Sequence, residues 1–280
     1  MKEKICMVTG ANKGMGKAAA LEFAKQGATV IMVCRNPQLG KVAQDEIKRL
    51  SGSKTVELFI ADLSSQQSVR KFVEQFQSKH SKLHVLFNNA GGLFTENHIL
   101  SVDNIEMNLG VNYFSTFLLT NLLLDRLIAS GSGRIIHTSS MMMAKSLNWD
   151  AFTGKQTLSP MKMYGLSKLA IVLYTYKLAR KLAGTGVTVN ALHPGFVHTD
   201  NATNSFPKML RPLMTIFKPF VLTPEQGSQT ALYLASSPEV EGITGKYFVK
   251  KKEKSSVPIS YDEALQERVW TYSAELTGSE

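Results

Sequence analysis

The chain has 280 residues, of which 44% are hydrophobic, 19% charged and 9% aromatic, the profile of a globular protein with ample material for a core. Its net charge of +10 admits nucleic acid, a membrane surface or an anionic ligand as partner, but no helix-turn-helix, zinc-finger or aromatic RNA-binding signature accompanies it, so nucleic-acid binding is not expected. No apolar run is long enough to cross a membrane and the N-terminus lacks the apolar segment of a signal peptide, so we expect a cytoplasmic protein without a transmembrane segment.

Short β-branched runs alternate with segments of helical periodicity along almost the whole chain. The runs predict strands at 5–9, 29–34, 56–61, 84–88, 134–139, 187–192 and 246–249. The segments between them predict helices at about 14–26, 37–50, 66–79, 101–130, 161–183 and 224–236. A repeated βαβ pattern requires a parallel sheet with helices on both faces. We therefore predict an α/β fold, a doubly wound, seven-stranded parallel sheet in a single domain over 1–280.

Two stretches, 141–160 and 194–223, are the least regular parts of the chain, and both follow predicted strands. Ligands of open α/β sheets bind beyond the carboxyl ends of strands, so these stretches are candidate walls of a substrate site; plain surface loops are the alternative. The basic cluster 246–254 is most simply a solvated edge or loop. Cys6 and Cys34 lie in apolar runs with no CxxC pattern or nearby histidine, which predicts core thiols and no metal site.

The stretch "TGANKGMGK" at 9–17 combines three glycines with two lysines. Gly10, Gly14 and Gly16 follow a predicted strand and open an amphipathic helix, whose free N–H groups and positive dipole end would face an anion. A pyrophosphate fits that description, although the spacing is G-x-x-x-G-x-G and not the common G-x-G-x-x-G.

The residue after the second predicted strand discriminates between dinucleotides. An acidic residue there would bind a ribose 2′-hydroxyl, whereas Arg35 can pair with a 2′-phosphate through its planar fork. Lys13 would add a second positive charge close to the same phosphate. The pair therefore favours NADP(H) over NAD(H); the alternative is that both are ordinary surface cations. Lys17, on an unknown helix face, has no assigned role.

Tyr164 and Lys168 fall four residues apart on a predicted helix, so their side chains project from one face, one turn apart. Ser139 and Ser140 stand at the carboxyl end of the preceding strand, at the same rim of the sheet. A phenol beside an ammonium and a cationic nicotinamide would have its pKa lowered from about 10, which suits it to exchange a proton with a carbonyl or an alcohol. A serine hydroxyl would polarise the same oxygen.

At this point the chain resembles the short-chain dehydrogenase/reductase family over nearly its whole length. The matching motifs, in family order, are "TGANKGMG", "ADLSS", "NNAG", "VNYFSTFLLT", "TSS", "YGLSK" and "HPGFVHT". The residues just after the second predicted strand and those near the end of the chain look most like the corresponding residues of the retinol-dehydrogenase-like and protochlorophyllide-reductase-like branch. The resemblance implies a Rossmann fold.

The resemblance also implies a catalytic tetrad of Asn112, Ser140, Tyr164 and Lys168. Tyr164 would be the general acid, Ser140 would orient the carbonyl, Lys168 would anchor the ribose and tune the tyrosine, and Asn112 would support a proton-relay water. Ser140 is chosen over Ser139 because the family's catalytic serine is the second of such a pair.

Further cofactor contacts follow from the same resemblance. Besides Tyr164 and Lys168, they are Gly10, Asn12, Lys13, Gly14, Met15, Gly16, Arg35, Asp62, Leu63, Asn89, Ala90, Gly91, Val111, Pro194, Gly195, Val197 and Thr199. Some have structural alternatives, because "NNAG" partly stabilises the central sheet and Val111 and Pro194 fit a core or a turn equally well.

The interval from Ser140 to Tyr164 is 24 residues, about ten more than the shorter family pattern, so 141–160 is expected to make an excursion beside the pocket. Met141, Met142 and Met143 would line a lipophilic site there or pack beneath the loop. Family analogy makes 198–223 a substrate lid, with a membrane-surface element or oligomer contact as alternatives for 206–222, and leaves 250–280 as a C-terminal tail.

These features together lead to an expected function. We expect an NADP(H)-dependent oxidoreductase that interconverts a carbonyl and an alcohol on an apolar small molecule, in a homo-oligomer that is a dimer or tetramer. The alternatives are a non-catalytic NADP(H)-binding regulatory or scaffold protein and, through the charge of +10, a binder of nucleic acid or anionic membranes.

Overall fold

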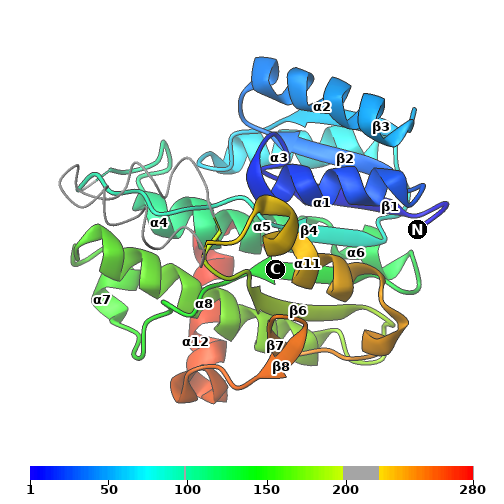
Figure 1. Cartoon of the computed structure of the whole chain (residues 1–280). Helices are drawn as coiled ribbons and strands as arrows, with labels where there is room; N and C mark the ends of the chain where they lie inside the picture. Colours follow the sequence, from blue (N-terminus) through cyan, green and yellow to red (C-terminus); the bar gives the residue numbers. More distant parts are fainter. Residues whose placement is uncertain (98, 198–220, 280) are drawn as a thin grey trace.

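The computed structural model describes residues 1–97, 99–197 and 221–279. Within them one sheet runs through the molecule in the order β3-β2-β1-β4-β5-β6-β7-β8 (Figure 1). Its strands are β1 Ile5–Thr9, β2 Thr29–Cys34, β3 Val56–Ile60, β4 Val85–Asn88, β5 Arg134–Thr138, β6 Thr188–His193, β7 Lys246–Val249 and β8 Lys252–Lys254. The first seven are parallel and match the predicted strands within one residue at either end, which confirms the Rossmann-type, doubly wound sheet.

The eighth strand corrects the prediction of a wholly parallel, seven-stranded sheet. β8 runs antiparallel to β7, with Val249 paired to Lys252 across a two-residue turn. It was missed because "KEK" is neither apolar nor alternating, and its pairing is dictated by the turn and not by its own side chains. An edge strand of charged residues also protects the sheet from pairing with other chains.

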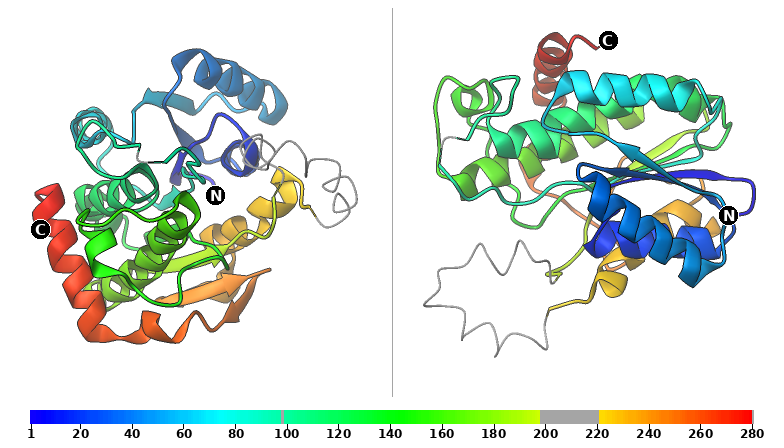
Figure 2. Two further views of the ribbon diagram at one scale, coloured as in Figure 1. Left: turned by 90° about the vertical axis from the view of Figure 1, so that its left-hand side faces the viewer. Right: turned by 90° about the horizontal axis from the view of Figure 1, so that it is seen from above.

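Two layers of helices cover the sheet, with bounds close to those predicted. The main helices are α1 Gly14–Lys25, α2 Pro37–Ser51, α3 Gln66–Gln77, α5 Ser115–Leu122, α8 Pro160–Lys181, α11 Pro224–Ser236 and α12 Glu263–Thr277. Figure 2 shows α1 and α2 on one side of the sheet and α3, α5 and α8 on the other. Alternate residues of β1 enter different apolar cores: Cys6 and Val8 pack with α1 and α11, whereas Met7 packs with α3, α5 and α8.

The continuous helix predicted over 101–130 is wrong. The segment instead contains a short α4 (Met107–Leu109), a π-helical turn (Gly110–Phe114), α5, and α6 (Leu124–Ile128), with the helix broken at Leu123. Glu106 caps the start, its Oε2 accepting a bond of 2.9 Å from the Leu109 N–H. Helical periodicity predicted the apolar face of this segment. It cannot reveal a π turn, because such a turn inserts one residue into the helix without changing the composition. Elsewhere in the described residues, short helices lie at α7 (Trp149–Phe152), Pro238–Val240 and Pro258–Tyr261.

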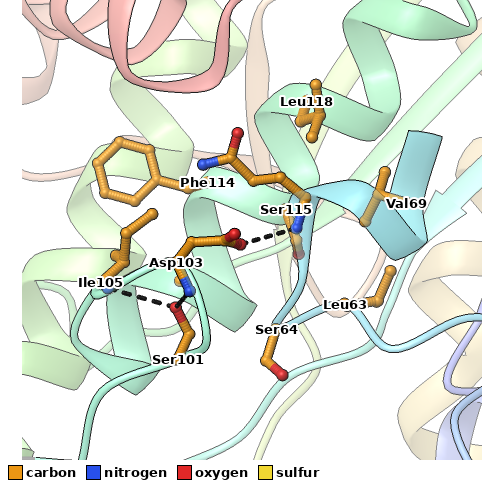
Figure 3. A pocket seen from close by; sticks show the side chains of 11 residues that line it. Leu63, Ser64, Val69, Ser101, Asp103, Ile105, Phe114, Ser115 and Leu118 are labelled. Carbon is orange, nitrogen blue, oxygen red and sulfur yellow. Dashed lines mark hydrogen bonds between the residues drawn. The ribbon is translucent and has the colours of Figure 1, made fainter.

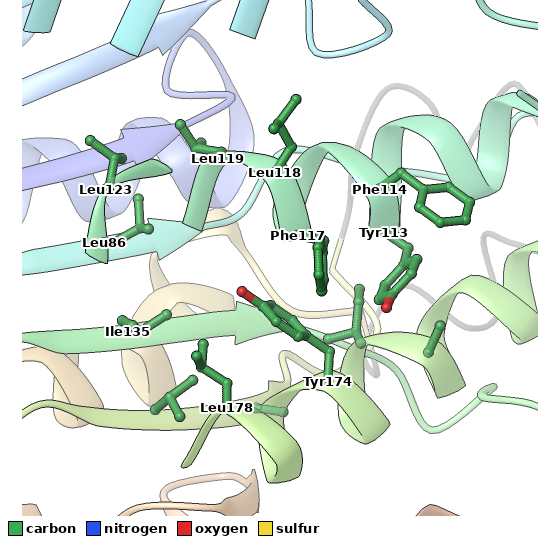
Figure 4. Packing of buried hydrophobic residues seen from close by; sticks show 14 of the residues in the cluster. Leu86, Tyr113, Phe114, Phe117, Leu118, Leu119, Leu123, Ile135, Tyr174 and Leu178 are labelled. Atoms are coloured by element: carbon green, nitrogen blue, oxygen red, sulfur yellow. The ribbon is translucent and has the colours of Figure 1, made fainter. Parts of the chain in front are cut away.

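The C-terminal segment is packed and not a tail. Trp270 of α12 is 7% exposed and lies against the aromatic core of Tyr113, Phe117 and Tyr174, three residues that Figure 4 shows together. The Tyr113 and Ser273 hydroxyls are 2.8 Å apart, and Lys181 Nζ lies 4.4 Å from the centre of the Trp270 ring. We predicted no helix in this segment, whereas the structure has one whose Val269 and Trp270 are buried.

Parallel strands bring their carboxyl ends to one rim of the sheet. At β1 and β4 the strand order reverses direction, which opens a crevice at that rim where α/β proteins bind ligands. Among the described residues, no helix is long and apolar enough to cross a membrane.

Candidate active site

The glycine loop after β1 is built so that backbone, and not side chains, faces the crevice. Gly10 and Gly14 have φ of +66° and +55°, a region that favours glycine. A Cβ on Gly16 would lie 2.4 Å from the Gly10 carbonyl oxygen and 2.5 Å from Asn89 Nδ2, so the start of α1 is pressed against the loop and against the end of β4. Asn12 and Met15 are half-buried between these glycines.

The N-terminus of α1 leaves its first N–H groups without a side-chain cap. The N-cap residue, Lys13, makes no capping hydrogen bond, and the first turn carries no acidic residue. Free N–H groups and the positive helix end therefore meet a concave glycine loop. A dinucleotide pyrophosphate fits this arrangement in both charge and space.

Arg35 emerges beside that loop. The Gly10 N–H donates to the Val33 carbonyl oxygen at 2.8 Å, which ties the loop to β2 two residues before Arg35. Arg35 and Lys13 are both exposed, as a phosphate-binding pair requires. Cys34 and Cys6 are buried thiols with their pKa raised by burial to about 11 and about 12, which confirms them as unreactive core residues. Lys17 pairs with Glu46 of α2 and so has a structural role.

The motifs after β3 and β4 hold the crevice together. Asn89 Nδ2 donates to the Thr9 carbonyl oxygen at 2.9 Å, and the N–H groups of Asn89 and Ala90 both donate to Thr9 Oγ1. Asp62 Oδ1 accepts from the N–H and the hydroxyl of Ser64, which closes a tight turn around Leu63 just before α3. These bonds give the predicted cofactor-contact residues a structural task as well.

Asn112 lies on the π-helical turn and is hydrogen-bonded to the loop after β4. Its Oδ1 accepts from the Gly92 N–H at 2.9 Å, and its Nδ2 donates to the Gly92 carbonyl oxygen at 3.0 Å and to Ser167 Oγ at 3.1 Å. Gly91 has φ +147°, and a Cβ there would lie 2.5 Å from Asn112 Oδ1. The π turn thus aims Asn112 at Gly91 and Gly92 and leaves Val111 half-buried on the crevice side.

Tyr164 and Ser140 are brought together at the carboxyl end of β5. Tyr164 lies close enough to the Ser140 hydroxyl for that hydroxyl to lower the pKa of the phenol, and Ser140 Oγ accepts from the Met142 N–H at 3.1 Å. Ser139 is engaged elsewhere, because its Oγ donates to the Lys168 carbonyl oxygen at 2.8 Å. Burial raises the pKa of Tyr164 and outweighs the opposing effect of the Ser140 hydroxyl. The lowered tyrosine pKa that we expected is therefore not a property of the chain itself.

The Lys168 amine lies below the tyrosine, 4% exposed. Its Nζ is 5.5 Å from the centre of the Tyr164 ring and donates to the Thr138 carbonyl oxygen at 2.9 Å. Burial lowers the pKa of this amine to about 7. Lys168 can therefore gain or lose a proton near neutral pH, and this explains why it alone does not lower the pKa of the phenol.

The loop after β6 closes the crevice from the other side. A Cβ on Gly227 of α11 would lie 2.5 Å from Val197 Cγ2 and 2.9 Å from Met15 Sδ, so the glycine loop and the loop after β6 meet over α11. Gly195, with φ +91°, would place a Cβ 2.5 Å from Leu222 Cδ1, and Pro194 is half-buried before it. Thr199 and nearly all of the 198–223 segment predicted as a lid lie outside the described residues.

Sequence reasoning missed His193. Its ring is 5% exposed at the end of β6, its Nδ1 accepts from the Met141 N–H at 3.3 Å, and burial lowers its pKa to about 4. It thus joins the loop that carries Ser140 to the loop after β6. The motif "HPG" was the available signal. Met143 is buried in the core, whereas Met141 and Met142 are 58% and 46% exposed beside the site.

A separate pocket lies next to the crevice, between the start of α3 and the π-helical turn (Figure 3). It is a small cavity of about 10 Å³ and includes Leu63 and Phe114 among its lining residues, but none of the predicted tetrad. Across it, Asp103 Oδ2 accepts from the Gln66 N–H at 2.7 Å. The chemistry therefore belongs to the open crevice and not to this pocket. No cluster of metal-binding side chains occurs in the part of the chain that the structure describes.

Comparison with known proteins gives one consistent family. A family profile described as short chain dehydrogenase matches residues 4–210. Human retinol dehydrogenase 14 is 38% identical over 294 residues, which cover 99% of this chain and 87% of that protein. Human polyprenol dehydrogenase is 38% identical over 287 residues, which cover 99% and 86%.

Solved structures agree with the sequence relatives. A crystal structure of an uncharacterised protein from Mycobacterium paratuberculosis superposes with a TM-score of 0.79 at 29% identity, covering 100% of this chain and 95% of that one. An NAD(P)-dependent gluconate 5-dehydrogenase from Beutenbergia cavernae, solved with bound NADP, superposes with a TM-score of 0.71 at 28% identity and covers 89% and 96%.

Proposed function

The chain belongs to the short-chain dehydrogenase family, in its retinol-dehydrogenase-like branch, and from this premise we propose that it is an NADP(H)-dependent oxidoreductase. It interconverts a carbonyl and an alcohol on an apolar small molecule, with Tyr164 as general acid and base. The observation that carries the proposal is the approach of Tyr164 to Ser140 at the end of β5, with the buried Lys168 amine 5.5 Å from the centre of the Tyr164 ring.

Tyr164 and Ser140 converge on one point, where the substrate oxygen binds. A tyrosine whose pKa is raised by burial is protonated, so its hydroxyl donates to a carbonyl oxygen and can transfer that proton as the oxygen gains charge. Ser140 offers a second hydroxyl to the same oxygen and keeps it in place. In the oxidation direction Tyr164 must first lose its own proton; the tyrosinate then accepts the proton of the alcohol, while Ser140 keeps its hydrogen bond to the alcohol oxygen.

Lys168 and Asn112 support this proton transfer. The amine, with a pKa lowered by burial to about 7, can be charged at neutral pH and then favours the tyrosinate that forms as the proton leaves. Asn112 clamps Gly92 and sits against Gly91, which lies beside Lys168 Nζ. It therefore shapes the space in which a relay water would bind.

The glycine loop, Asp62, Asn89 and the loop after β6 are the residues that would hold the dinucleotide. When bound, NADP(H) supplies or accepts the hydride. Arg35 and Lys13 would pair with its 2′-phosphate; their exposure beside the loop supports this preference. One structural neighbour was solved with NADP and another, from Escherichia coli, with NADPH.

The apolar substrate class is inferred from the rim of the site. Met141, Met142 and Phe196 are exposed just after the carboxyl ends of β5 and β6, at the same rim of the sheet as Ser140. Two relatives carry names that specify retinol and polyprenol, both apolar alcohols. Flexible methionines suit a hydrophobic substrate without fixing its shape.

The decisive experiment compares wild type with Tyr164→Phe on a panel of carbonyls and alcohols, followed by NADPH absorbance. Tyr164→Phe should bind NADPH normally, because the aromatic ring remains, while turnover falls about a hundredfold or more with the loss of the hydroxyl that donates the proton. An active Tyr164→Phe enzyme would refute the assignment. Absence of turnover by wild type with every compound would favour a non-catalytic NADP(H)-binding protein. A cytoplasmic location and a homo-oligomeric state stay predictions, the second testable by light scattering.

A further inference from the structure

The hairpin between β7 and β8 turns on two lysines in an unfavourable conformation. Lys250 and Lys251 have φ of +50° and +63°, and they are the two central residues of the turn that pairs Val249 with Lys252. A two-residue hairpin turn with both φ values positive strongly favours Asn-Gly, because side chains beyond Cβ are crowded there. Two lysines at these positions are therefore not explained by the needs of the turn.

The charge of the hairpin is largely uncompensated. Its five lysines, at 246, 250, 251, 252 and 254, are all exposed, and only one acid, Glu253, lies among them. Glu253 pairs with Lys246 at 2.9 Å, and Lys251 Nζ contacts Gln229 Oε1 at 3.2 Å. Within the described residues, no carboxylate lies within 4.0 Å of the remaining three lysines.

Exposed apolar side chains lie at the same rim. β5, β6 and β7 are neighbours in the sheet, and their carboxyl ends lead to Met141, Phe196 and Lys250 in turn. Met141 and Phe196 are 58% and 63% exposed. His193 connects them: it accepts from the Met141 N–H, its ring lies 6.1 Å from that of Phe196, and it pairs in register with Val249.

We propose that this rim, the β7–β8 turn together with Met141 and Phe196, is a docking surface for an anionic phospholipid bilayer. The lysines meet the lipid phosphates, and the adjacent apolar side chains enter the interface between headgroups and acyl chains. Nucleic acid fits this surface less well, because the hairpin carries no exposed aromatic side chain between its lysines on which bases could stack. Docking in this orientation turns the mouth of the site toward the bilayer. It requires no turnover and so does not depend on the proposed activity.

The test uses the purified full chain in flotation with vesicles of phosphatidylcholine alone or with about 30% phosphatidylserine, at about 0.1 M salt. Wild type should bind the phosphatidylserine vesicles and not the neutral ones. K250N/K251G should bind roughly 25-fold more weakly, since each surface lysine contributes about fivefold. Its thermal unfolding midpoint should stay unchanged or rise, because Asn-Gly relieves the two positive φ angles.

Two further variants sharpen the result. K54Q/K82Q removes the same charge from exposed positions just before β3 and β4, at the opposite rim, and should bind like wild type. If K250N/K251G does not fold, K252Q/K254Q on β8 replaces it with the same expected loss. F196S should weaken the binding that survives at about 0.5 M salt, where charge is screened.

Several outcomes would overturn the proposal. Equal binding to neutral and anionic vesicles, or full binding by a folded hairpin variant, would remove the lysines from the interaction. An equal loss in K54Q/K82Q would show a general effect of net charge. Preference for duplex DNA over phosphatidylserine vesicles at equal phosphate would assign the hairpin to nucleic acid instead.

Discussion

Ser139 donates a hydrogen bond of 2.8 Å from its Oγ to the carbonyl oxygen of Lys168. The bond fastens the end of β5 to the middle of α8, with Ser139 2% exposed. Its neighbour Ser140 is free to turn its hydroxyl to Tyr164. Two adjacent serines that are equivalent in the sequence therefore take different tasks, one in holding the site and one in facing the substrate.

This difference predicts opposite results for two matched substitutions. Ser140→Ala should lower kcat about a hundredfold with little change in stability, since it removes a donor to the reacting oxygen. Ser139→Ala should leave kcat within a few-fold of wild type and lower the free energy of unfolding by about 1 kcal/mol, the contribution of one buried hydrogen bond. Steady-state kinetics and urea unfolding of both variants measure this. A larger kcat loss in Ser139→Ala would reverse the assignment.

Arg35→Asp should change the choice of cofactor. The substitution removes a charge-assisted partner of the 2′-phosphate and adds a repelling carboxylate, so the preference for NADPH over NADH should fall at least tenfold. The measurement is the ratio of the two dissociation constants, from fluorescence titration. Arg49→Asp, an exposed position of α2 with the same change in charge, is the control and should keep the wild-type ratio. An unchanged ratio in Arg35→Asp would contradict the role of Arg35.

The buried Lys168 amine predicts a pH dependence of stability. Its pKa is lowered from 10.5 to about 7 in the folded chain, so between pH 7 and 10.5 the unfolded state binds more protons. Stability contributed by this site therefore rises with pH in that window and is constant below it, where the lysine is protonated in both states. Relative to Lys168→Met, wild type should gain at most about 1.4 kcal/mol per pH unit. Urea unfolding from pH 7 to 10 without cofactor measures it; parallel curves would show that the amine is not desolvated.

Trp270→Ala tests the docking of α12. The indole is 7% exposed against Tyr174 and Phe117, so its removal should lower the free energy of unfolding by about 3 to 5 kcal/mol. The adjacent Thr271→Ala, at an exposed position of the same helix, should change it by less than about 0.5 kcal/mol. Equal stability of the two variants would mean that 263–277 contributes nothing to the core.

The sequence by itself determined the parallel sheet and most of its helices. Strands such as β1 and β2 are nearly continuous apolar runs, and their bounds follow from composition alone because both faces of the sheet are covered. The approach of Tyr164 to Lys168 also follows from local geometry, since residues four apart on a helix are neighbours. The glycine loop was predictable for the same reason, because the backbone conformation that requires glycine is set by neighbouring residues in the sequence.

The tertiary structure alone decided what depends on distant contacts and on burial. The π turn that aims Asn112 and the packing of α12 are set by neighbours far away in the chain. The partners of Ser139 and Ser140 depend on how α8 lies against β5. In the chain itself burial raises the pKa of Tyr164 and outweighs the opposing effect of the Ser140 hydroxyl, which local pattern cannot indicate because desolvation depends on the surrounding protein. The local sequence pattern specifies the helices and strands, whereas the way these elements bury one another specifies the pKa values and hydrogen-bond partners of the site residues.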